Sequence, residues 1–92
     1  RITGTGSDLP LLLAILSSFR NRILPAKTVV FGEVGLSGEV RPVFNGEERL
    51  KEAVSLGFKR AIIPKANQPR RAIEGMSINA VVNLEEAISA AF

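Results

Sequence analysis

Residues 30–43 read VFGEVGLSGEVRPV, and this stretch predicts a β-hairpin. An apolar strand over residues 28–33 leads into a turn rich in glycine and serine at residues 35–38. Glycine and serine suit tight turns, because glycine reaches backbone conformations that other residues avoid. A short strand over residues 39–43 then returns, and Pro42 closes it.

Residues 49–67 read RLKEAVSLGFKRAIIPKAN and predict a helix followed by a strand. Asn45 is the expected helix cap, Glu47 and Lys51 form an i,i+4 pair, and Gly57 ends the helix. Residues 61–63 are a continuous apolar run, which is typical of a buried parallel strand.

The flanking segments extend this alternation of strands and helices. Residues 1–3 are expected to end a strand, and a helix capped by Ser7 or Asp8 should run to about Phe19. Apolar residues cover almost its whole circumference, which predicts burial on most sides. A strand over residues 77–82 precedes a last helix, with a capping box from Asn83 to Glu86. The sequence predicts one α/β domain over residues 1–92.

Composition narrows the class of protein. The 92 residues are 46% hydrophobic and 23% charged, which is typical of a globular chain rather than a disordered one. Cysteine and histidine are absent, so thiolate metal sites and imidazole bases are excluded. The apolar run over residues 9–16 is too short to cross a bilayer. We expect no membrane partner and a cytoplasmic, reducing location, although a secreted domain without cysteine also fits.

Three motifs together resemble the C-terminal Lon-protease-like domain of the bacterial RadA (Sms) DNA repair proteins. They are GSDLPLLL at residues 6–13, FGEVGLSGEVRPV at residues 31–43 and PKAN at residues 64–67. The resemblance implies a Lon-protease-like (ribosomal protein S5 domain 2-like) fold. Because the chain opens on a strand-like tripeptide, we expect it to lack the first strands of that fold.

The same resemblance implies properties of a parent protein. RadA is a DNA-dependent ATPase that forms a hexameric ring and promotes branch migration in recombinational repair. It uses ATP, magnesium and zinc, but the corresponding motifs do not occur in these 92 residues. We therefore expect no cofactor in this chain, self-association as a ring, and DNA partners that are branched or single-stranded.

A Lon-family Ser–Lys protease, or its inactive remnant, is the alternative. Such enzymes place the serine before the first helix, where this chain has Gly6 or, with a one-residue shift, Ser7. They place the lysine at the start of the next helix, where this chain has Glu47. A carboxylate cannot act as the neutral amine base that a serine nucleophile needs. We expect no catalytic residue here, and a capping role for Ser7.

The basic residues suggest where a partner binds. The net charge is +3, and five cations fall in one stretch without an acid: Lys59, Arg60, Lys65, Arg70 and Arg71. Such a cluster is either a solvated face or a contact for phosphate backbones, and the RadA resemblance favours DNA. Tyrosine and tryptophan are absent, so base stacking is not visible in the sequence.

Two further arginines are candidates for subunit or DNA contacts. Arg41 belongs to the returning strand of the hairpin, and Arg49 to the exposed side of the second helix. A surface salt bridge is the competing interpretation for each. The sequence thus predicts a non-catalytic, DNA-contacting scaffold domain of a RadA-type ATPase. A third hypothesis is the Lon-like domain of a magnesium-chelatase-like competence protein, whose hairpin is similar, although the PKAN ending suits RadA better.

Overall fold

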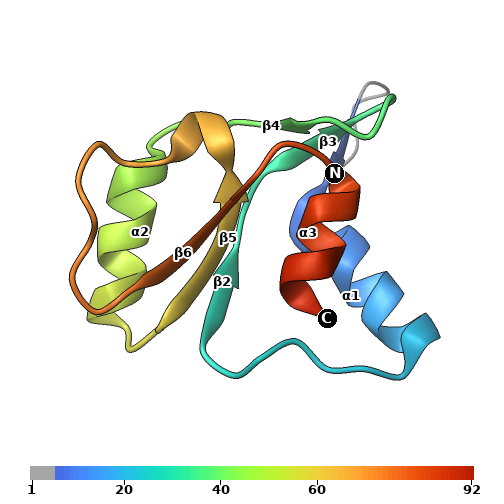
Figure 1. Cartoon of the computed structure of the whole chain (residues 1–92), viewed down its shortest axis with the longest axis horizontal. Coiled ribbons are helices and arrows are strands. Elements are labelled where there is room, and N and C mark those ends of the chain that lie inside the picture. Colours follow the sequence, from blue (N-terminus) through green and yellow to red (C-terminus); the bar gives the residue numbers. More distant parts are fainter. Residues whose placement is uncertain (1–5) are drawn as a thin grey trace.

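A computed structural model describes residues 6–92 of the chain, and it confirms the α/β class (Figure 1). The expected strand over residues 1–3 lies outside the described residues. The helices are α1 (Leu9–Arg20), α2 (Gly46–Ser55) and α3 (Leu84–Ala91), with one 3₁₀ turn, η1 (Lys65–Asn67). The strands are β1 (Gly6–Asp8), β2 (Thr28–Val30), β3 (Glu33–Gly35), β4 (Val40–Arg41), β5 (Arg60–Pro64) and β6 (Ser77–Val81).

The strands form two small sheets. One is antiparallel, in the order β1-β3-β4, and contains the predicted hairpin, with Val34 opposite Val40. The other is parallel, in the order β2-β5-β6, with Ala61 between Val29 and Ile78. The prediction of a buried parallel strand at residues 61–63 is therefore confirmed.

The first half of the hairpin is not one strand. Residues 28–33 were expected to be continuous, but the chain leaves the parallel sheet after Phe31 and joins the antiparallel sheet at Glu33. Gly32 makes this change of sheet possible, because it adopts a φ of 138°. A Cβ built on Gly32 would lie 3.1 Å from Cγ of Pro64, so the position needs glycine for space as well as for conformation.

Helices cover both faces of the parallel sheet, as Figure 1 shows, with α2 on one side and α1 and α3 on the other. Strand residues alternate between the two sides, since successive side chains point to opposite faces. Ile62 packs with Leu9, Leu13 and Ala87, whereas Ala61 and Ile63 pack with Leu50 of α2.

The expected burial of the first helix is wrong for half of its surface. Leu9 and Leu13 of α1 are fully buried, but Leu11 is 49%, Ile15 44% and Phe19 85% exposed. The reason is that α3 and the two sheets cover one side of α1, while within residues 6–92 nothing covers the other. A stripe with a spacing of four residues therefore remains apolar and exposed.

The helix ends confirm one of the two caps predicted for α1, the cap of α3 and the end of α2, and they correct the roles of Ser7 and Asn45. Asp8, not Ser7, caps α1, and its carboxylate accepts from the Leu11 N–H at 3.1 Å. Asn45 precedes α2 with a φ of 59°, and its side chain makes no capping hydrogen bond. Asn83 caps α3, accepting from the Glu86 N–H at 2.8 Å. Gly57 ends α2 as predicted, with a φ of 95°.

Candidate nucleic-acid interface

The five predicted cations do not form one patch. Lys59 and Arg60 lie at the start of β5, whereas Lys65 follows its end, in η1. At about 3.3 Å per strand residue, roughly 20 Å separates Lys59 from Lys65. Arg70 and Arg71 lie in the loop between η1 and β6. The stretch is continuous in sequence, but β5 spreads it over both ends of the parallel sheet.

Lys27 joins the group at the start of β5, although it was not among the residues predicted from the sequence. Its carbonyl accepts from the N–H of Lys59 at 2.8 Å and of Arg60 at 3.1 Å. Lys27 holds a φ of 59°, a left-handed conformation that turns the chain into β2. We call Lys27, Lys59 and Arg60 the cation corner. All three are exposed, and within residues 6–92 none of them forms an ion pair.

The signal that could have found Lys27 is topological. Lys27 immediately precedes an apolar strand, as Lys59 and Arg60 precede the next strand of the same sheet. Parallel neighbours begin at the same edge, so residues in front of them meet there. The pairing of Thr28 with Arg60, and of Arg60 with Ser77, shows this alignment.

An apolar recess borders the cation corner. Lys27, Leu56, Gly57 and Phe58 line a hollow of about 210 Å³. Leu56 and Phe58 also line a second hollow of about 220 Å³ between α2 and β2, together with Glu52 and Arg49. Cationic and apolar groups therefore share the surface at the amino edge of the parallel sheet.

Arg70 and Arg71 form a second, separate basic surface. Both are exposed, and they line a hollow of about 340 Å³ with Ile73 and Met76. Like the cation corner, this pair makes no ion pair with an acid in the part of the chain that the structure describes.

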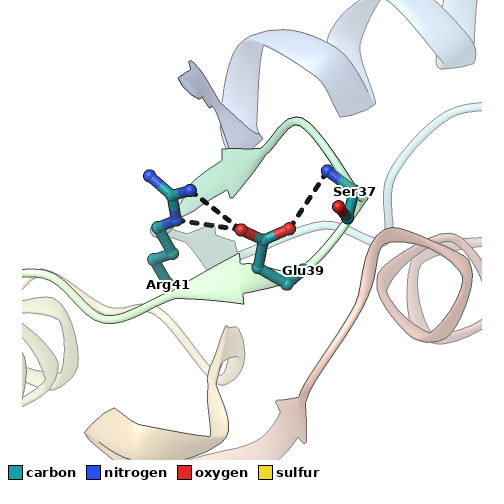
Figure 2. Close-up of polar contacts among 3 residues, drawn as sticks. All are labelled: Ser37, Glu39 and Arg41. Atoms are coloured by element: carbon teal, nitrogen blue, oxygen red, sulfur yellow. Dashed lines mark hydrogen bonds and ion pairs between the residues drawn. The ribbon is translucent and has the colours of Figure 1, made fainter. Parts of the chain in front are cut away.

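Arg41 is held by a carboxylate in the hairpin. Figure 2 shows the Glu39 carboxylate accepting from Arg41 Nη2 at 2.8 Å and Nε at 3.1 Å, and from the Ser37 N–H at 3.2 Å. Hydrogen bonding by its own backbone N–H, and then by Arg41, lowers the pKa of the Glu39 carboxyl. Both side chains stay partly exposed, at 45% for Glu39 and 41% for Arg41.

Arg49 is held by local contacts as well. Its Nε donates to the carbonyl of Phe44 at 3.1 Å, and its guanidinium carbon lies 5.9 Å from the ring centroid of Phe31. This distance is within the range of a cation–π contact. The roles predicted for Arg41 and Arg49 in partner binding stay predictions.

The resemblance places Ser7 and Glu47 near the Ser–Lys dyad of Lon-type proteases, and in the structure they lie in different elements. Ser7 lies in β1, opposite Val34 of β3. Glu47 lies in the first turn of α2, where it is exposed and 3.6 Å from Lys51 Nζ. The predicted Glu47–Lys51 pair is thus confirmed, and it accounts for the cation next to this position.

The comparisons identify the family of this domain. A family model described as subunit ChlI of Mg-chelatase matches residues 1–67. The chain belongs to this family. That description agrees with the predicted likeness of the hairpin to magnesium-chelatase-like proteins.

Curated relatives of this ChlI-family chain match it nearly end to end and are named DNA repair protein RadA. The relative from Pseudomonas aeruginosa is 56% identical over 92 residues, which are 100% of this chain and 20% of the relative. That from Escherichia coli is 56% identical over 89 residues, 97% of this chain and 19% of the relative. That from Bacillus subtilis is 44% identical over 86 residues, which are 88% of this chain and 18% of the relative. The predicted resemblance to RadA is confirmed, and the chain spans about one fifth of these relatives.

No helix within residues 6–92 has the length and apolar character needed to cross a bilayer. In the same part of the chain, no three acidic, histidine or cysteine side chains gather as metal ligands would.

Proposed function

We propose that this chain is the non-catalytic, DNA-contacting Lon-like domain of a RadA-type DNA-dependent ATPase that promotes branch migration in recombinational repair. The observation that carries the proposal is the identity of 40–56% to proteins named DNA repair protein RadA, over 86–92 residues in the relatives that match nearly the whole chain. In this proposal the domain, residues 1–92, provides a binding surface and catalyses no reaction.

The local structure supports a domain without catalysis more than it supports a protease. A Ser–Lys enzyme needs a lysine whose amine is neutral and close to the nucleophile. The position of that lysine holds Glu47, whose carboxylate is paired with Lys51 on the exposed side of α2. A protease or its remnant therefore remains the less favoured alternative.

Two basic surfaces support a contact with DNA. The cation corner and the Arg70–Arg71 pair are exposed and lack acidic partners within residues 6–92. When exposed, unpaired cations bind phosphates, they release the counterions condensed on the nucleic acid. This release drives the association. Lys65 lies at the opposite edge of the sheet from the corner and would add a further phosphate contact.

ATP, magnesium and zinc belong to the parent protein in this proposal. The chain has no cysteine or histidine for a zinc site. Its glycine-rich segment at residues 32–38 leads into β4 rather than into the amino end of a helix, so it does not fit a phosphate-binding loop.

Self-association as a ring, expected to be hexameric in the full protein, is the other part of the proposal. The exposed stripe of Leu11, Ile15 and Phe19 on α1 supports it, since contiguous apolar surface favours burial against a partner. Sedimentation of the wild type and of Phe19→Ser tests this part. A concentration-dependent mass that Phe19→Ser lowers is expected, and a monomer at all concentrations would contradict it.

The proposed DNA contact is tested by charge reversal at two places. Fluorescence anisotropy with duplex and forked oligonucleotides compares the wild type, Lys27→Glu/Lys59→Glu and Arg70→Glu/Arg71→Glu. The control, Arg20→Glu/Lys51→Glu, changes the net charge equally at two exposed positions that line neither of the hollows beside the basic surfaces. We expect weaker binding in the first two variants and a smaller loss in the control. Equal affinity in all four proteins would contradict the proposal.

A further inference from the structure

Cationic and apolar groups lie side by side at the amino edge of the parallel sheet. This combination indicates whether the domain contacts single-stranded or duplex DNA. The lysines of the cation corner alone would suit any phosphate backbone. The adjacent recess adds a partly exposed aromatic ring, Phe58, and the aliphatic side chain of Leu56, which is 70% exposed. The bases of duplex DNA cannot pack against such a surface, because they are stacked inside the double helix.

The backbone fixes the position of Phe58. Its N–H donates to the Ala53 carbonyl at 2.9 Å, and the Gly57 N–H donates to the Val54 carbonyl at 3.0 Å. With Gly57 at a φ of 95°, these bonds form a Schellman motif at the end of α2. The next residue, Lys59, is tied to Lys27. Phe58 is therefore held beside two lysines before any ligand arrives.

Lys27 is the one charged residue within residues 6–92 that lines the recess. Lys27 lines the hollow together with Leu56, Gly57 and Phe58. Glu52 and Arg49 both line the neighbouring hollow, which shares Leu56 and Phe58 with the recess, so one acid and one base offset each other there. A phosphate is attracted toward Lys27 and Lys59, so a bound strand would keep its backbone over the lysines and direct a base onto the apolar ring.

We propose that the recess formed by Lys27, Leu56 and Phe58 receives an unpaired base of a single nucleic-acid strand, with the adjoining phosphates on the cation corner. This inference rests on the proposed DNA contact. It adds that the cation corner and its recess favour single-stranded over duplex DNA. Single-strand binders commonly join a basic track to an aromatic platform, because every base offers a face for stacking. Neither Lys27 nor Phe58 was among the sequence candidates.

The test separates stacking from charge. Anisotropy at low salt compares an unstructured single strand, an abasic strand of equal length and a duplex. Phe58→Ala should weaken binding of the single strand roughly five- to a hundredfold, and leave the abasic strand and the duplex unchanged. Phe58→Tyr should retain the affinity. Phe44→Ala is the matched control, because Phe44 is 83% exposed and precedes the opposite end of α2.

Each further outcome is decisive. If Lys27→Glu/Lys59→Glu weakens all three ligands while Phe58→Ala weakens none, the stacking proposal is overturned and the DNA contact stands. If the wild type binds no nucleic acid, both fail. Displacement of the single strand by polyglutamate of equal charge as effectively as by unlabelled strand would identify an acidic peptide site and overturn the proposal.

A measurement on the wild type covers the case in which Phe58→Ala does not fold. A single strand containing 5-iodouracil is irradiated with the protein, and the cross-linked peptide is identified by mass spectrometry. Cross-linking within residues 56–59 is expected. Cross-links confined to the loop of Arg70 and Arg71 would overturn the assignment.

Discussion

The side chain of Asn67 pairs with the backbone of Val43 as a neighbouring strand would. Its Oδ1 accepts from the Val43 N–H at 2.8 Å, and its Nδ2 donates to the Val43 carbonyl at 3.0 Å. These two bonds connect η1 to the chain that follows the hairpin. Gly46 makes room for the amide, since a Cβ on Gly46 would lie 2.5 Å from Asn67 Nδ2.

The first prediction concerns this pair. Asn67→Ala leaves the N–H and the carbonyl of Val43 without partners in a partly buried position, which costs about 1–3 kcal/mol of unfolding free energy. Urea unfolding measures the loss. Gln68→Ala is the control, because Gln68 is exposed and its hydrogen bond to Lys65 comes from the backbone. Equal stability of the two variants would show that the Asn67 bonds do not stabilise the fold.

The second prediction concerns the point where the chain changes sheets. Gly32→Ala combines an unfavourable φ of 138° with a Cβ 3.1 Å from Pro64 Cγ. Gly57→Ala isolates the conformational cost, because its φ is 95° and a Cβ there meets nothing within 4 Å. Strained residues of this kind cost on the order of 1–3 kcal/mol. Gly32→Ala should therefore lower the urea midpoint more than Gly57→Ala, and the reverse order would refute the crowding argument.

The third prediction uses the lowered pKa of Glu39. A carboxyl whose pKa is lower in the folded state than in the unfolded state stabilises the fold above the unfolded pKa. That stability is lost as the pH falls below the ordinary value of 4.5 and through the folded pKa. Melting temperatures of the wild type and Glu39→Gln should therefore differ at neutral pH and converge in acid.

A substitution next to Glu39 provides an independent check. A Cβ on Gly35 would occupy the place of the Glu39 carboxylate, so Gly35→Ala should remove the same acid-sensitive stability. Ser37→Ala is the matched control, because it keeps the backbone N–H that Glu39 accepts from. A difference from Glu39→Gln that persists unchanged at low pH would argue against the titration of Glu39.

The fourth prediction is that the domain does not cut peptides. The resemblance to Lon-type proteases puts Glu47 at the position of the lysine, and its carboxylate pairs with Lys51. Incubation with casein and with a fluorophosphonate probe should give neither cleavage nor labelling. Labelling that disappears in Ser7→Ala would identify an active serine and refute this account.

Local signals in the sequence predicted much of this fold. The capping of α3 by Asn83, the end of α2 at Gly57 and the Glu47–Lys51 pair each depend on residues a few positions apart. Such contacts are set by the geometry of a helix turn, so they can be derived from spacing.

Features that depend on distant segments could not be predicted in this way. The break at Gly32 arises because Pro64 and Val40 approach it from other strands. The exposed stripe of α1 has the same apolar pattern as its buried face, and only the placement of α3 and the sheets distinguishes them. Lys27 joins Lys59 and Arg60 through the register of β2 and β5, which the sequence does not state.

The central claim is that this domain holds DNA through exposed cations, and the salt dependence of duplex binding tests it most directly. Each phosphate contact contributes about −0.9 to the slope of the logarithm of the association constant against the logarithm of the salt concentration. With three to four contacts, this slope should be roughly −3. The reversal Arg70→Glu/Arg71→Glu and the reversal Lys27→Glu/Lys59→Glu remove different groups, so each should make the slope shallower by about 2. A slope that stays the same in both variants, or binding that does not depend on salt, would contradict the account.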